Sequence, residues 1–145
     1  MDSEILKKCT LCPCECNVNR LNGNIGKCRA KGKVKIALAN LHYYEEPCIS
    51  GENGSGTVFF SGCNMSCKFC QNYKVSQNYL GKEIEIEDLA CEFLRLQKEK
   101  ANNINLVTGF MYIPQIIEAI RIAKSNGLII PIIYNSSGYE KVESL

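Results

Sequence analysis

The clearest pattern in the chain is a helical periodicity of apolar residues in its second half. It predicts an amphipathic helix over Ile86–Lys98, with an acidic start and a basic end that suit the helix dipole. A second helix is predicted over Pro114–Ser125, which Asn126 and Gly127 terminate. The apolar faces consist of Ile86, Leu89, Ala90, Phe93 and Leu94 in the first helix and Ile113, Ile116, Ile117, Ile120 and Ala123 in the second. Cys91 lies within the first pattern and is predicted to belong to the core.

Short apolar runs between these segments predict strands at residues 57–60, 104–108 and 129–134. The third run is almost wholly apolar, as a buried parallel strand is, although Pro131 removes one ladder donor. Partial alternation over Lys33–Asn40 predicts a further strand. The order strand, helix, strand, helix, strand is typical of an α/β fold in which right-handed crossovers join parallel strands.

Polar or cysteine residues follow each of the three predicted parallel strands, at residues 62–70, 108–112 and 135–139. In barrels of this class the functional loops lie at the carboxyl ends of the strands. We therefore expect these three loops to meet at one functional site.

Composition excludes several classes of partner. A chain of 145 residues suggests one domain, and its net charge of +2 with no long basic run gives no reason to expect nucleic acid or an anionic membrane. Its apolar runs are too short to cross a bilayer, and the first eight residues lack the apolar core of a signal peptide. A soluble, cytoplasmic protein is expected, and in a reducing compartment its ten cysteines favour metal binding or catalysis over disulfides.

Cys63, Cys67 and Cys70 form the most informative motif, with three residues between the first two and two before the third. Three thiolates on one loop can hold three corners of a cubane iron–sulfur cluster and leave the fourth iron open. An open coordination position distinguishes a catalytic metal site from a closed structural one. The alternatives are a tetrahedral zinc loop or three unrelated buried thiols.

A second group of cysteines precedes this motif. Cys9, Cys12, Cys16 and Cys28 lie in a segment whose glycines indicate turns, and they could converge on zinc or on a second iron–sulfur cluster. Reduced structural thiols are the alternative. His42, the only histidine, lies beside two tyrosines, which favours a packing or hydrogen-bonding role.

The cysteine spacing, with Phe69 before the last cysteine and a strand before the first, resembles the signature of radical S-adenosylmethionine (SAM) proteins. Residues 45–51, 62–64 and 69–72 are similar to the radical SAM proteins related to pyruvate formate-lyase activating enzyme, and the similarity runs from Cys9 to Tyr139. It implies the N-terminal half of a partial TIM-like (βα)6 barrel with three parallel strands here. On this basis residues 1–50 form a cysteine-rich N-terminal segment and residues 51–145 a truncated radical SAM core.

The resemblance also implies a chemistry. Cys63, Cys67 and Cys70 would ligate a 4Fe–4S cluster, and SAM bound to the open iron would be cleaved to a 5′-deoxyadenosyl radical that abstracts hydrogen. By carry-over, Phe69 lies near the adenine, Thr108 and Gly109 hold the SAM amino group, and Asn135 and Ser136 border the same pocket. Activating enzymes carry Gly-Gly-Glu where this chain has Thr108-Gly109-Phe110, so the sequence departs from them there. Relatives often have a basic residue in place of Cys14, which leaves Cys14 out of the second ligand set.

The implied partners are an electron donor such as flavodoxin or ferredoxin and a glycyl radical enzyme as the protein substrate. Relatives continue well beyond the third strand, so we expect this chain alone to be incomplete, self-associating or dependent on another chain. Two other functions compete with a radical SAM enzyme: a non-catalytic iron–sulfur or zinc module, and a fragment without activity.

Overall fold

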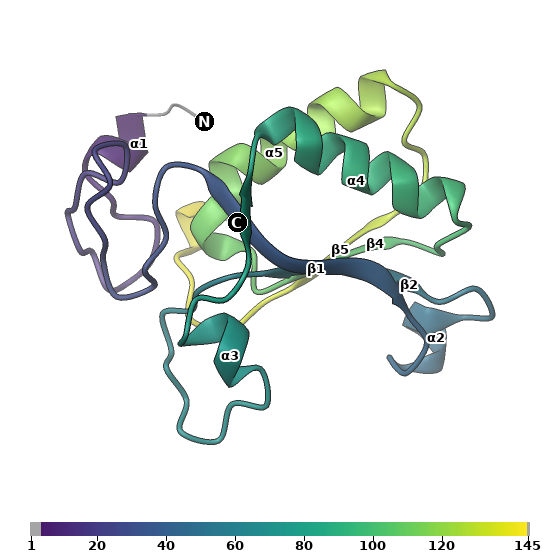
Figure 1. Ribbon diagram of the computed structural model, residues 1–145, viewed down its shortest axis with the longest axis horizontal. Helices are drawn as coiled ribbons and strands as arrows, with labels where there is room; N and C mark the ends of the chain where they lie inside the picture. Colours follow the sequence, from purple (N-terminus) through teal and green to yellow (C-terminus); the bar gives the residue numbers. More distant parts are fainter. Residues whose placement is uncertain (1–3, 145) are drawn as a thin grey trace.

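The computed structural model describes residues 4–144 and contains one mixed five-stranded sheet with helices on both of its sides (Figure 1). In chain order the elements are α1 (Glu4–Lys7), β1 (Val34–His42), α2 (Pro47–Ser50), β2 (Ser55–Phe60), α3 (Tyr73–Ser76), β3 (Lys82–Ile84), α4 (Ile86–Lys98), β4 (Ile104–Val107), the 3-10 turn η1 (Phe110–Tyr112), α5 (Ile113–Ser125), β5 (Ile132–Asn135) and a final 3-10 turn η2 (Val142–Ser144).

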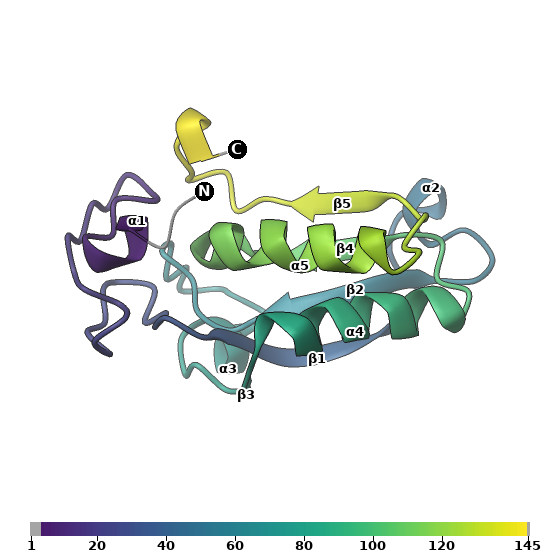
Figure 2. The ribbon, with the colours of Figure 1, turned by 90° about the horizontal axis from the view of Figure 1, so that it is seen from above.

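The strands lie in the order β3-β1-β2-β4-β5 (Figure 2). β2 pairs in parallel with β4 and β4 in parallel with β5, whereas β1 is antiparallel to both of its neighbours, β2 and β3. The strand expected over Lys33–Asn40 therefore exists as β1. β1 lies within residues 1–50, which were expected to form the cysteine-rich segment, but it pairs with β2 and so belongs to the sheet. The cysteine-rich part outside the sheet therefore ends near residue 33.

The hydrophobic core lies between the sheet and α4 with α5, which cover the same face (Figure 1). Leu89, Phe93 and Leu96 of α4 are fully buried against strand residues such as Val58 and Leu106. Both predicted helices are confirmed, α4 with the expected bounds and α5 beginning one residue earlier.

The assignment of Cys91 to the core is wrong, because its side chain is exposed. Position 91 lies two residues from both Leu89 and Phe93, about 200° away around the helix, and therefore faces solvent.

The strand predicted over residues 129–134 is shorter than expected. β5 starts only at Ile132, and Ile129 is 87% exposed. Pro131 has no N–H to donate, but its carbonyl accepts a hydrogen bond from the Ile104 N–H at 2.8 Å, so the pairing with β4 begins at this point. β5 lies at one edge of the sheet.

The three loops at the carboxyl ends of β2, β4 and β5 contact one another. The Tyr112 hydroxyl donates to the Ser61 carbonyl at 3.1 Å, and the Thr108 N–H donates to the Asn135 carbonyl at 3.0 Å. The Asn64 amide joins the first loop to the third through the Tyr139 carbonyl at 2.8 Å. The three loops therefore meet at the carboxyl ends of the strands, and their joint role as one functional site stays a prediction. No helix within residues 4–144 has both the length and the apolar character needed to cross a membrane.

Replacing Phe93 by alanine should lower the free energy of unfolding by about 3–5 kcal/mol, because it removes a fully buried aromatic ring and leaves a cavity. Cys91→Ser on the exposed face of the same helix should change it by less than about 0.5 kcal/mol. Urea denaturation followed by circular dichroism measures both, and equal losses would contradict the described packing of α4.

Candidate functional site

Cys63, Cys67 and Cys70 lie on the loop that leaves the carboxyl end of β2 and leads into α3. All three thiols are half-buried. The Met65 N–H donates to the Cys63 sulfur at 3.4 Å, and the Cys70 sulfur contacts the Ser76 hydroxyl at 3.3 Å. Such hydrogen bonds to sulfur are one of the means by which proteins tune iron–sulfur clusters.

The backbone of this loop is tightly constrained at its start. Gly62 has a φ of +101°, and a Cβ at this position would lie 2.3 Å from the carbonyl oxygen of Cys28. Only glycine permits this conformation together with such a close approach. The loop that carries the cysteine motif is thus packed against the backbone of the cysteine-rich segment.

A polar cavity of about 450 Å³ opens on the face of the sheet opposite α4 and α5. Its walls come from the end of β1 and the turn after it, from the residues directly following Cys70, and from the carboxyl halves of the three parallel strands. The lining residues are His42, Tyr44, Glu45, Phe59, Gln71, Asn72, Val107 and Asn135. The cysteine loop therefore borders a cavity that offers hydrogen-bonding side chains from three parts of the chain.

His42 contributes to this cavity in a way that its sequence context did not indicate. Its Nδ1 atom lies 3.4 Å from the Glu45 carboxylate, and its ring meets the edge of Tyr44 at a centroid distance of 6.0 Å. The expected packing role is thus present, and it places an imidazole and a carboxylate together in the cavity wall.

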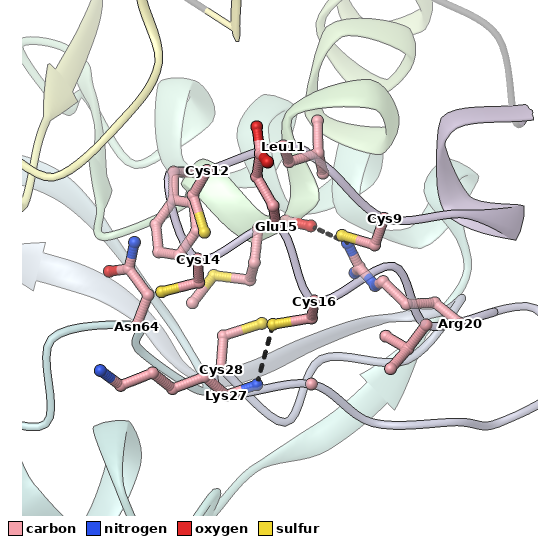
Figure 3. Close-up of a pocket in the computed structure, with 14 residues that line it drawn as sticks. Cys9, Leu11, Cys12, Cys14, Glu15, Cys16, Arg20, Lys27, Cys28 and Asn64 are labelled. Atoms are coloured by element: carbon pink, nitrogen blue, oxygen red, sulfur yellow. Dashed lines mark hydrogen bonds between the residues drawn. The ribbon is translucent and has the colours of Figure 1, made fainter.

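The cysteines of the N-terminal segment line a second, smaller cavity. Figure 3 shows it with Cys9, Cys12, Cys14, Cys16 and Cys28 among the labelled residues, all of which the sequence brings in on turns. Its volume is about 20 Å³, enough for about one water-sized sphere. Burial raises the pKa of the Cys28 thiol to about 11. Burial and the neighbouring Cys12 raise the pKa of Cys14.

The sulfur atoms do not surround one common point in either group. Within residues 4–144, no three cysteine, histidine, aspartate or glutamate side chains are arranged to hold one metal ion. The donor types and spacings fit the expected centres, whereas the described side chains are not arranged around a common ion.

A family model described as the radical SAM superfamily matches residues 57–145, which is more than half of the chain and includes the motif Cys63, Cys67, Cys70. The chain belongs to the radical SAM superfamily. Enzymes of this superfamily typically use a 4Fe–4S cluster and SAM. The uncharacterized protein MJ0674 of Methanocaldococcus jannaschii is 31% identical over 147 residues, covering 97% of this chain and 42% of that protein. The chain thus spans less than half the length of this curated relative. No solved structure matches it significantly.

The residues expected to bind SAM in this radical SAM domain are not all gathered in the polar cavity. Asn135 lines it. Thr108, with a φ of +53°, and Gly109 lie at the strand end, and Gly109 packs against Phe60 and Ile116 on the helix side of the sheet. The Ser136 hydroxyl donates to the Glu140 carboxylate at 2.8 Å, outside the cavity lining. Phe69 is 92% exposed.

Sequence reasoning missed Arg20, which is 1% exposed and joins the cysteine-rich segment to the radical SAM core. Its guanidinium donates to the Lys31 carbonyl at 2.7 Å and to the Met111 carbonyl at 2.7 Å, and it lies 5.7 Å from the centre of the Tyr112 ring. An arginine among turn residues gives no sequence signal for burial, so only the structure reveals this contact.

Gly62→Ala tests the constraint on the cysteine loop. We expect a loss of about 1–2 kcal/mol from the positive φ and a further loss of about 1–3 kcal/mol from the clash with the Cys28 carbonyl. Gly138→Ala is the matched control, because Gly138 also has a positive φ but a Cβ added there would meet no atom within 4 Å, so it should show only the first loss. Thermal or urea unfolding of both variants would separate the two effects, and equal losses would refute the close contact.

Proposed function

We propose that this chain is the cluster-binding part of a radical SAM enzyme of the activating type. The observation that carries the proposal is the position of Cys63, Cys67 and Cys70, on the loop that follows the first parallel strand and borders a polar cavity. The superfamily match over the same residues supports it. The three thiolates would hold three irons of a 4Fe–4S cluster, and the fourth iron would be free to bind SAM.

The proposed fold is the N-terminal half of a (βα)6 barrel. β2, α4, β4, α5 and β5 supply parallel strands and crossover helices in the required order, and β1 with β3 extends the sheet at one edge. The polar cavity would then lie on the inner face of the barrel, at the carboxyl ends of the strands, where barrel enzymes bind their substrates.

A 4Fe–4S cluster held by Cys63, Cys67 and Cys70 would supply the electron for the reductive cleavage of SAM. The chain's own residues bind and orient SAM. The side-chain amides of Gln71, Asn72 and Asn135 can donate hydrogen bonds to its carboxylate and ribose, and the sheet excludes water from one side.

The proposed substrate is a glycine residue of a partner protein, from which hydrogen is abstracted. The proposed electron donor is flavodoxin or ferredoxin. Both proposals rest on the similarity of residues 45–51, 62–64 and 69–72 to activating-enzyme relatives. Glu45 of that similarity lies in the cavity wall, which supports a role near the substrate.

A non-catalytic metal–thiolate module is the second candidate function. One observation favours it: Phe69, the residue expected near the adenine, is exposed to solvent. Such a module would bind a cluster or zinc without responding to SAM.

The first test is electron paramagnetic resonance of the anaerobically reconstituted, reduced chain. SAM should shift the cluster signal, and 5′-deoxyadenosine should accumulate, because SAM binds the open iron. Cys67→Ser should abolish both effects, whereas Cys91→Ser, which alters an exposed thiol on α4, should leave them unchanged. A cluster whose signal ignores SAM would favour the non-catalytic module instead.

The second test addresses the cavity. Asn135→Ala should weaken SAM binding by about 5–10-fold, the equivalent of one lost hydrogen bond of about 1 kcal/mol. Asn78→Ala is the control, because Asn78 lies outside the cavity lining. Equilibrium binding of SAM to the reconstituted protein provides the measurement, and equal affinities would remove Asn135 from the proposed site.

A further inference from the structure

We propose that Cys9, Cys12, Cys16 and Cys28 bind a single zinc-type ion, that Arg20 balances the charge of this site, and that the site holds the radical SAM cysteine loop in place. The proposal concerns a second centre, separate from the one that would bind SAM. It is carried by the cavity that the cysteines line, by the buried guanidinium beside it and by the contact between Cys28 and Gly62.

The cavity has the donors and the size for one ion. Four thiolates are a common ligand set of structural zinc sites. The cavity of about 20 Å³ has room for one ion. The thiols must lose their protons and turn about their Cα–Cβ bonds to coordinate it, so binding releases protons, as it does at other zinc–thiolate sites.

Two local backbone features favour a thiolate at Cys16: a hydrogen bond to its sulfur and a glycine that lets the backbone approach it. The Lys27 N–H donates to this sulfur at 3.4 Å, a contact that supports a thiolate once the proton has left (Figure 3). Gly26 permits the approach, since a Cβ there would lie 2.8 Å from both the Cβ and the sulfur of Cys16. The turn at residues 26–28 thus brings the last ligand, Cys28, next to the first three.

Arg20 supplies the charge argument. A divalent ion with four thiolates carries a net charge of −2, which is costly to bury without a cation nearby. The Arg20 Nη1 atom lies 4.0 Å from the Cys9 sulfur, and no ion pair within residues 4–144 includes Arg20. A buried guanidinium held by carbonyl oxygens is thus placed to balance a metal–thiolate centre.

The same groups connect this centre to the radical SAM loop. The carbonyl of Cys28 faces Gly62, directly before Cys63, and Asn64 lines the cysteine cavity while its amide contacts the Tyr139 carbonyl. Arg20 reaches the Met111 carbonyl in the loop after β4. Residues 8–33 contain no helix or strand, so a metal ion would fix a segment that otherwise depends on turns.

The experiment separates this centre from the SAM cluster by removing the ligands of the latter. A chain with Cys63, Cys67 and Cys70 replaced by alanine is purified with zinc supplied, and its zinc, iron and acid-labile sulfide are measured. We expect about one zinc per chain and no sulfide. Adding Cys12→Ser should remove the zinc, whereas adding Cys91→Ser on the exposed face of α4 should retain it.

Cobalt substitution of the same chain gives a second readout. The tetrahedral thiolate absorption of bound Co²⁺ should disappear with Cys16→Ser and persist with Cys14→Ser. Arg20→Gln should lower zinc affinity by about 10–100-fold, as the loss of an outer-shell partner does, and Arg20→Lys should recover part of it. Circular dichroism of each variant shows that it is folded.

The proposal would be overturned by a folded triple variant that binds no zinc, by iron with stoichiometric sulfide in place of zinc, or by zinc that survives Cys12→Ser. Loss of cobalt absorption in Cys14→Ser would overturn the assigned ligand set.

If the proposed radical SAM function fails, the reconstituted wild-type chain shows no response to SAM while the triple variant still binds zinc. The two failures are therefore distinguishable. In the wild-type background, Cys12→Ser should also lower the iron content of the SAM-binding cluster, because the loop that carries its ligands loses the support of the metal-bound segment. Unchanged iron content would overturn the holding role.

Discussion

The buried guanidinium of Arg20 is the contact on which the arrangement of this chain depends. A charge with almost no solvent exposure costs several kcal/mol unless its donors are satisfied, and the carbonyls of Ala30, Lys31 and Met111 satisfy them. The first two carbonyls belong to the approach to β1, and the third belongs to the loop after β4. The five donors of arginine can join these separate segments in a fixed plane, which the three donors of a lysine ammonium cannot do in the same geometry.

Because of this contact, the cysteine-rich segment lies at the same edge of the sheet as the functional loops. In Figure 2 the arrows of β2 and β5 point toward the end of the molecule at which α1 and the cysteine-rich segment lie. Parallel strands bring their carboxyl ends together, so the loops that carry Cys63, Thr108 and Ser136 leave the same end of the sheet. β1 is antiparallel to β2 and runs in the opposite direction. The turn after β1 places Glu45 in the wall of the polar cavity, on the face of the sheet opposite α4 and α5.

The sequence predicted those parts of the structure whose information is local. The 3.6-residue periodicity of α4 and the spacing of Cys63, Cys67 and Cys70 each depend on a short stretch. The first predicted the helix, and the second predicted the radical SAM superfamily. β3 was missed because Lys82-Glu83-Ile84 is too short to show an alternation and is formed by pairing with β1. The burial of Arg20 and the meeting of His42 with Asn135 in one cavity depend on contacts distant in sequence. Phe69 was expected to lie near a bound ligand. Its ring is exposed instead, because nothing within residues 4–144 covers it.

The two faces of the sheet differ in a way that bears on what the cavity is for. On the helix side, Val58 and Leu106 are apolar and closely packed. On the cavity side, Asn105 lies in register with Thr57 and shares its face with Val107, which lines the cavity. Asn105 is fully buried, yet both atoms of its amide lack a hydrogen-bond partner among the described residues. An unpaired buried amide costs about 1–3 kcal/mol per group, so a central strand that served only as core would favour an apolar residue at this position. The middle of this face is therefore polar at Thr57 and Asn105, beside the cavity that Phe59 and Val107 line, and apolar packing alone does not account for the choice of Asn105.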